Sequence, residues 1–155
     1  MSPAAELRPE ACNCLALRQA ARHVTQFYDR FLMPAAGLRA TQFSILAKLK
    51  RLGPMTINAL AEAMVMDRTT LGRNIQPLER EGLIAVRQGR ADRRSRELHL
   101  TDAGAERLRA ATEAWAEAQT RFESVFGRER ASDLRALLRA VTAGDLGGSA
   151  VGADV

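Results

Sequence analysis

Polar and basic side chains gather at the start of one short predicted helix, and their chemistry suits contact with DNA. They follow Asp67 and are Arg68, Thr69, Thr70, Arg73 and Gln76. At helical spacing, Leu71, Ile75 and Leu78 form an apolar seam, which leaves the polar group facing outward. Arginine donates hydrogen bonds to guanine in the major groove, and threonine contacts bases or phosphates there. The pattern indicates a helix that reads DNA, although a helical hairpin with a solvated polar face would show the same pattern.

A shorter helix is predicted immediately before this one. Thr56 can cap this helix with its side-chain oxygen, and the apolar residues that follow recur at helical spacing. These apolar residues are Ile57, Leu60, Ala61 and Met64. Val65 and Met66 form the turn, and Asp67 offers its carboxylate to the free N–H groups of the next helix. Residues 55–82 therefore predict a helix-turn-helix unit.

A predicted β-hairpin with a basic tip follows the second helix. Pro77 should bend that helix about one turn before Gly82 ends it. Residues 83–87 and 96–100 have the apolar or alternating pattern of strands. The segment 87–96 contains five arginines and one acid, and the residues of its tip include Arg90, Asp92, Arg93 and Arg94. Because such positive charge repels itself, it favours a tip that meets phosphates or a narrow minor groove over a simple solvated cluster.

Five short motifs occur in a fixed order along the chain, and their combination is more specific than any one of them. They are Leu60-Ala61, Asp67-x-x-Thr70-Leu71-x-Arg73, Leu78-Glu79-Arg80-Glu81-Gly82-Leu83-Ile84, Asp92-Arg93-Arg94-Ser95 and Leu100-Thr101-Asp102-Ala103-Gly104. With this order the sequence resembles the MarR family of dimeric winged-helix transcription regulators, over about residues 10–143. The resemblance implies that Arg94 enters the minor groove and that Asp92 helps to hold it. The major-groove readers that it implies are Arg68, Thr69, Thr70 and Arg73.

Long helices on both sides of this unit carry more apolar surface than one subunit easily buries. Residues 10–33 are apolar over more than one face, and residues 38–52 form a further helix. Residues 101–126, capped by a threonine, and residues 128–143 complete the chain's helices. The apolar stripe of the first of these two consists of Leu108, Ala111, Trp115, Ala118 and Phe122. The residues expected to face solvent are Arg107, Glu113, Glu117, Arg121 and Glu123.

The predicted fold is mainly α with a small β component (α+β), a winged helix-turn-helix whose N- and C-terminal helices form an intertwined homodimer. We expect residues 38–100 to be the DNA-binding domain and residues 10–33 and 101–143 to be dimerisation helices. Residues 1–9 and 144–155 are expected to be flexible termini. A two-fold dimer holds two recognition helices about one DNA turn apart, which demands an inverted-repeat operator in double-stranded DNA.

Length and charge agree with this organisation. The chain has 155 residues with 46% hydrophobic content, which suits one domain or one subunit of a dimer. Its 23 basic and 18 acidic residues give a formal charge of +5, which suits a polyanionic partner. We see no signal peptide and no apolar run near the roughly 20 residues that span a bilayer, so we expect a cytoplasmic protein without a membrane partner.

No catalytic motif is visible in the sequence. The two histidines, His23 and His99, do not form a ligand-spaced pair, and HExxH, GxSxG and glycine-rich phosphate loops are absent. We therefore expect no enzyme activity, no catalytic residue, no metal and no cofactor. The better competing hypothesis is an architectural DNA-binding protein without a regulatory role, and a ligand pocket would favour a regulator over it.

The family resemblance also implies a pocket for phenolic or other aromatic effectors between the dimer helices and the winged domain. The candidate lining residues are His23, Phe27, Tyr28, Phe43 and Trp115. The alternative for each of them is a place in the core. With such a pocket, the expected function is that of a sequence-specific repressor that releases its operator when an effector binds.

Cys12 and Cys14 leave a second form of regulation open. Side chains two residues apart on a helix point to different faces, so a disulfide between them is strained, and a zinc site lacks two further ligands. A bond to the partner subunit, a pair of ordinary cysteines and thiol-based peroxide sensing remain alternatives. Tyr28 follows Cys14 by the spacing seen in the peroxide-sensing branch of the family, but Ala40 stands near the position of that branch's second tyrosine.

Overall fold

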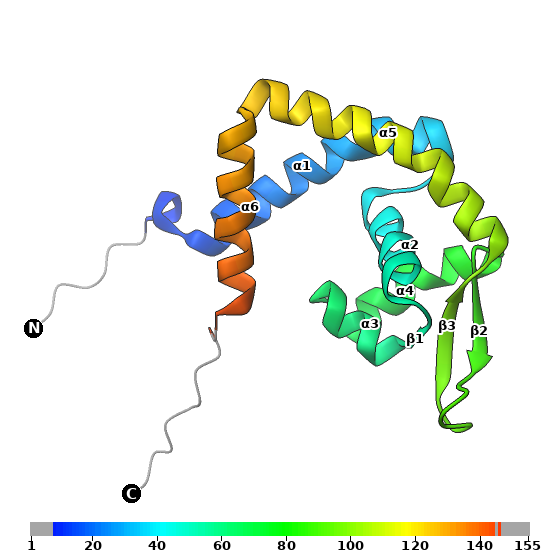
Figure 1. The fold of residues 1–155 in the computed structure, drawn as a ribbon. Helices are drawn as coiled ribbons and strands as arrows, with labels where there is room; N and C mark the ends of the chain where they lie inside the picture. The colour runs from blue at the N-terminus through cyan, green and yellow to red at the C-terminus, as the bar shows by residue number, and fades with distance from the viewer. Residues whose placement is uncertain (1–7, 145, 147–155) are drawn as a thin grey trace, which may run out of the picture. The chain divides into compact units, whose positions relative to one another are not determined.

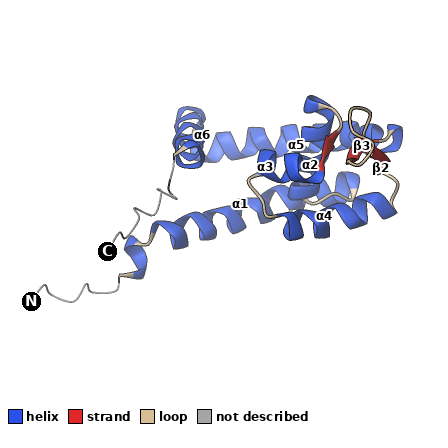
Figure 2. Cartoon of the chain, turned by 90° about the horizontal axis from the view of Figure 1, so that it is seen from below, coloured by secondary structure: helices blue, strands red, loops and turns tan. Residues whose placement is uncertain are grey.

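Seven helical segments and three strands follow one another in residues 8–144 and 146, the residues that the computed structural model describes (Figures 1 and 2). They are the 3-10 helix η1 (Pro9–Ala11), α1 (Asn13–Ala36), α2 (Ala40–Leu52), β1 (Met55–Thr56), α3 (Ile57–Met64), α4 (Arg68–Arg80), β2 (Ile84–Gln88), β3 (Arg96–Leu100), α5 (Asp102–Phe126) and α6 (Arg128–Ala143). The chain divides within α5 into two units, residues 1–115 and residues 116–155. The mainly helical fold with a small antiparallel wing confirms the predicted α+β winged architecture of the subunit.

Helix α1 is longer at its end than the sequence predicted. The prediction ended it at Met33 because Pro34 follows, but the helix continues to Ala36. A proline in the last turn removes one backbone hydrogen bond and does not prevent the turn from forming. The helix ends instead at Gly37, whose φ of 64° is left-handed and whose N–H donates to the carbonyl oxygen of Met33 at 2.9 Å.

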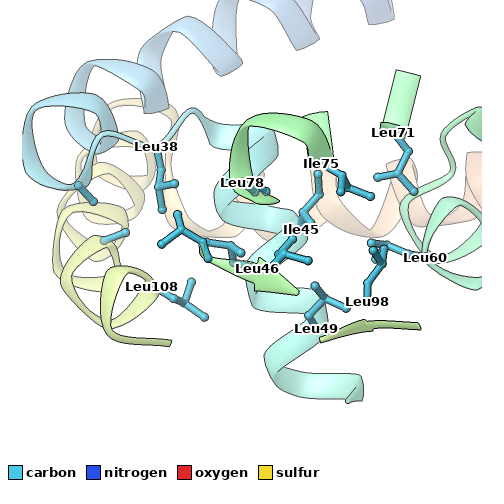
Figure 3. Packing of buried hydrophobic residues seen from close by; sticks show 14 of the residues in the cluster. Leu38, Ile45, Leu46, Leu49, Leu60, Leu71, Ile75, Leu78, Leu98 and Leu108 are labelled. Carbon is cyan, nitrogen blue, oxygen red and sulfur yellow. The ribbon is translucent and has the colours of Figure 1, made fainter. Parts of the chain in front are cut away.

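One face of α4 packs against the hydrophobic core of the first unit. The apolar seam predicted from the sequence, Leu71, Ile75 and Leu78, is buried. Figure 3 shows it among buried side chains of α2, α3 and β3, which include Ile45, Leu46, Leu60 and Leu98. Burying one face of α4 leaves its opposite face in solvent, so packing alone sets which residues can meet a partner.

The sheet contains one strand that the sequence did not reveal. Its order is β1-β3-β2, and both pairs are antiparallel. Met55 of β1 and Val86 of β2 both pair with Leu98 of β3. Strand β1 has two residues, which is too short for an alternating pattern to be read. Strand β3 has the predicted bounds, whereas β2 begins one residue later than predicted, at Ile84.

The start of α5 is hydrogen-bonded to, and packed against, the segment between α4 and β2. The hydroxyl of Thr101 donates to the carbonyl oxygen of Gly82 at 2.6 Å and accepts from the N–H of Gly104 at 3.0 Å, so Thr101 caps α5 as predicted. A Cβ atom added to Gly104 would overlap the carbonyl oxygen of Leu83. The first turn of α5 therefore touches the backbone that leaves the recognition helix, and only glycine fits there.

Two of the five charged residues predicted to face solvent along α5 are partly buried and paired, so that prediction was wrong for them. Arg107, in the first unit, donates to the carbonyl oxygen of Ala36 at 3.3 Å and to a carboxylate oxygen of Glu81 at 3.1 Å. Glu123, in the second unit, forms an ion pair with Arg135 of α6 at 3.2 Å. Arg107 and Glu123 each pair with an oppositely charged residue on another helix, and the amphipathic pattern of α5 alone does not show such partners.

The second unit consists of the end of α5 and helix α6. Gly127, with a φ of 101°, separates the two helices, and α6 has the predicted bounds. Ala118 and Ala131 are buried, and the guanidinium of Arg130 lies 4.4 Å from the ring centre of Phe126. Large apolar side chains of this unit remain exposed, and they include Val125, Leu137, Leu138 and Val141.

Among the described helices, none is long and apolar enough to cross a bilayer. The predicted flexible termini fall largely outside the described residues.

Candidate nucleic-acid interface

The carboxylate of Asp67 caps the N-terminus of α4. Asp67 accepts hydrogen bonds from the backbone N–H of Thr70 at 2.8 Å and from its hydroxyl at 2.6 Å. These bonds stabilise the ionised carboxylate, and the side-chain bond from Thr70, followed by its backbone bond, lowers the pKa of Asp67. The cap predicted for Asp67 is therefore present, and it fixes the direction in which α4 starts.

The predicted major-groove residues all lie on the exposed face of α4. They are Arg68, Thr69, Thr70, Arg73 and Gln76. Thr70 differs from the other four because its hydroxyl hydrogen is already donated to Asp67, which leaves only acceptor capacity for a base or phosphate. Pro77 lies within the helix, which continues past it to Arg80. Arg68, Thr69 and Thr70 precede the hydrogen bond that Pro77 removes, the one to the carbonyl of Arg73, whereas Arg73 and Gln76 lie in the turn that this bond would close.

The tip of the β2–β3 hairpin is an ordered turn rather than a loose cluster of charges. A carboxylate oxygen of Asp92 accepts from the backbone N–H of Arg94 at 2.9 Å, and its carbonyl oxygen accepts from the hydroxyl of Ser95 at 2.8 Å. Gln88 donates to the carbonyl oxygen of Arg93 at 2.7 Å. Asp92 therefore holds the backbone of Arg94, whose side chain stays exposed.

Three further residues that shape the wing were not among the site residues predicted from the sequence. They are Gln88, Gly89 and Ser95, none of which carries a charge. A Cβ atom on Gly89 would overlap the hydroxyl oxygen of Ser95 and lie 2.7 Å from the carbonyl oxygen of Asp92, so the turn closes only around glycine. The signal that could have found them is the combination of a glycine and short polar residues on both sides of the arginines. The exposed side chains that they hold outward belong to Arg90, Arg93 and Arg94.

A cavity of about 210 Å³ lies between α1, α2 and the first half of α5, within the first unit. Its walls include three of the five predicted pocket residues: Tyr28, Phe43 and Trp115. The rings of Phe43 and Trp115 stack with centroids 6.2 Å apart. The remaining lining residues are Val24, Thr25, Leu32, Ala40 and Ser44. The other two predicted residues do not line it, since His23 is exposed and Phe27 lies against Tyr28 and Phe31 instead.

Both cysteines are exposed near the start of α1. The sulfur of Cys12 accepts from the backbone N–H of Leu15 at 3.4 Å and so caps the helix, while Cys14 lies in its first turn. Within the part of the chain that the structure describes, no group of three His, Cys, Asp or Glu side chains is arranged to hold a metal ion.

The geometry of the first unit defines a winged helix-turn-helix. Helices α3 and α4 are joined by a short turn, and the β2–β3 hairpin lies beside α4 (Figure 1). Helix α4 exposes a basic face, and the tip of the hairpin carries exposed arginines. This arrangement is typical of proteins that place a helix in the major groove of DNA and a hairpin beside it.

Comparisons with known proteins agree with this class. Residues 38–95 match the MarR family. Over 104 residues the chain is 34% identical to the HTH-type transcriptional regulator PecS of Dickeya dadantii (strain 3937), which covers 65% of this chain and 63% of PecS. The aligned part thus spans just under two thirds of that relative's length.

Two solved structures of DNA complexes have the same fold. One is the M. tuberculosis transcriptional regulator MosR in complex with DNA, at 36% identity and a TM-score of 0.72, covering 85% of this chain and 97% of that one. The other is the transcriptional repressor CouR bound to a 23-mer DNA duplex, at 26% identity and a TM-score of 0.76, covering 88% and 99%. The chain belongs to the MarR family of winged helix-turn-helix transcriptional regulators, a family of DNA-binding proteins and not of enzymes.

Proposed function

We propose that two copies of this chain bind an inverted-repeat operator and repress transcription from it. Each copy lays the exposed face of α4 in the major groove, with Arg68, Thr69, Arg73 and Gln76 toward the bases and phosphates. Each wing brings Arg90, Arg93 and Arg94 to the flanking backbone and minor groove. The observation that carries the proposal is the ordered wing tip beside α4. Because of it, both α4 and the β2–β3 hairpin present arginine side chains to DNA from the same winged helix-turn-helix.

Exposed apolar side chains support the homodimer. Leu17 and Met33 of α1 are each 41% exposed, and Leu137 of α6 is 67% exposed. Apolar surface exposed on both helices is costly in water, and a two-fold partner covers the same surface on both copies. Measuring the molar mass in solution by light scattering tests this part of the proposal, which expects about twice the chain's 16.9 kDa. A mass near 16.9 kDa at micromolar concentration would exclude the dimer.

The cavity supports release by a small effector. Aromatic rings form part of its wall, and the hydroxyl-bearing residues Thr25 and Ser44 also line it. A small aromatic or phenolic molecule matches that combination of apolar walls and a few polar groups. Such a ligand would release the operator only if it bound the DNA-incompetent dimer more tightly than the competent one. Ligand-dependent release would also separate this function from that of an architectural DNA-binding protein.

Release by oxidation is a second candidate, because both thiols are open to solvent. The test compares operator binding before and after peroxide treatment in the wild type and in Cys14→Ser. Loss of release in the variant supports thiol sensing, and unchanged release in the variant removes Cys14 from the mechanism.

Operator binding is tested by fluorescence anisotropy with a labelled fragment of the protein's own promoter. Arg94→Ala should weaken binding by about 1–3 kcal/mol and lower the salt dependence of the affinity, because one cation leaves the interface. Arg73→Ala should also weaken binding, with loss of sequence discrimination if Arg73 reads a base. Arg128→Ala is the control, since it removes the same charge from an exposed position on α6. Wild-type affinity of Arg94→Ala would exclude the wing from the interface.

A further inference from the structure

Arg107 joins the ends of three helices in the first unit. It lies in the second turn of α5 and donates to the carbonyl oxygen of Ala36, the last residue of α1, at 3.3 Å. The same nitrogen lies 3.1 Å from a carboxylate oxygen of Glu81, the residue that caps the C-terminus of α4. A cation is favourable at this place because both helix ends carry unsatisfied carbonyl groups and the negative end of the helix dipole.

The position of this contact matters more than its strength. The side chains of Arg107 and Glu81 are 35% and 49% exposed, and ion pairs as open as this contribute little to folding stability. The contact lies at the C-terminal end of α4, whereas the predicted DNA-reading residues occupy its first turns. Helix α4 has 13 residues, so it is about 20 Å long. A rotation of about 5° at the anchored end moves the other end by nearly 2 Å, which exceeds the tolerance of a base contact.

We propose that Arg107 is a positioning residue that fixes the direction of α4 for DNA binding without touching DNA. This inference rests on the proposed DNA-binding function of α4. Thr101 and Gly104 hold the chain just after α4 against the first turn of α5, and Arg107 adds a contact one turn further along. Because Arg107 also holds the end of α1, it ties the recognition helix to α1 and α5, the helices that wall the cavity with α2.

A charge-matched pair of variants tests the assignment. Arg107→Gln and Arg109→Gln each remove one positive charge from positions two residues apart on α5, and each breaks an ion pair. The partner of Arg109 is Glu106 on the same helix, so Arg109→Gln leaves α4 untouched. Glu81→Gln removes the negative charge on the other side of the same contact. These three variants, the double variant Arg107→Gln/Glu81→Gln and the wild type are titrated against the labelled promoter fragment at several salt concentrations, and their melting temperatures are recorded.

Arg107→Gln and Glu81→Gln should each weaken binding about three- to tenfold, because the competent orientation of α4 is less populated. The double variant should be no weaker than the single ones, and Arg109→Gln should bind as the wild type does. The slope of log Kd against log salt should stay unchanged in all variants, since no phosphate contact is lost. Glu81→Gln is decisive because removing a negative charge would tighten DNA binding if charge alone mattered.

Three results would overturn the assignment. A salt slope reduced by about one in Arg107→Gln would make Arg107 a phosphate contact. Tighter binding by Glu81→Gln, or single variants within twofold of the wild type, would exclude a positioning role. Should Arg107→Gln fail to fold, Glu81→Gln carries the same test alone. Failure of the wild type to bind the fragment would instead refute the proposed function itself.

Discussion

Replacing Gly104 by alanine should destabilise the folded protein, although alanine is the better helix former. The added Cβ atom would overlap the carbonyl oxygen of Leu83 and lie 2.7 Å from Cδ1 of Leu100, so the first turn of α5 must move. Overpacking of this kind costs about 1–3 kcal/mol, and the helix propensity of alanine returns at most about 1 kcal/mol. We therefore expect a net loss of about 1–2 kcal/mol and a fall of roughly 2–8 °C in the melting temperature.

Gly72→Ala provides the matched control. Gly72 lies inside α4, and a Cβ atom there would meet nothing within 4 Å. The same substitution should raise stability by about 0.5–1 kcal/mol, because alanine loses less conformational entropy in a helix. Urea unfolding at one fixed protein concentration measures both free energies, since an oligomer's apparent stability depends on concentration. If Gly104→Ala proved as stable as Gly72→Ala, the close approach of α5 to Leu83 would be wrong.

Three further changes test other parts of the fold. Thr101→Val keeps the shape of the side chain but removes its bonds to Gly82 and Gly104, so urea unfolding should show a loss of about 1–2 kcal/mol, and an unchanged midpoint would exclude the cap. Val65→Gly should raise the melting temperature by a few degrees, because Val65 has a left-handed φ of 51° and is 74% exposed; a fall would show that the turn needs its side chain. The pKa of Asp67 is lowered on folding, so its stabilisation is present at neutral pH and is lost as the pH falls through that lowered pKa. Wild type and Asp67→Asn should therefore converge in thermal stability toward acid pH, and a gap independent of pH would contradict this.

The sequence predicted those features that local pattern determines. The cap of α4 at Asp67 follows from one carboxylate placed before an apolar seam, and that seam is buried as expected. The bounds of α6 follow from Gly127 and the apolar period after it. The order of the motifs was specific enough to indicate the MarR family, which the comparisons show.

Features that depend on contacts between distant segments were not predictable. Strand β1 exists because Met55 pairs with Leu98, more than forty residues later, and two residues carry no period of their own. Arg107 looked like part of a solvated face because its partners, Ala36 and Glu81, lie on other helices. Of the predicted pocket residues, His23 is exposed for a similar reason, since which side of α1 meets α2 is decided by tertiary packing.

Hydroxyl-radical footprinting of the promoter by the purified protein tests whether a dimer of this chain binds an inverted-repeat operator. We expect two protected half-sites related by an inverted repeat and about one DNA turn apart, flanked by protection in the minor groove that weakens in Arg94→Ala. Protection of a single unrepeated site, or uniform protection without any sequence preference at low salt, would contradict it.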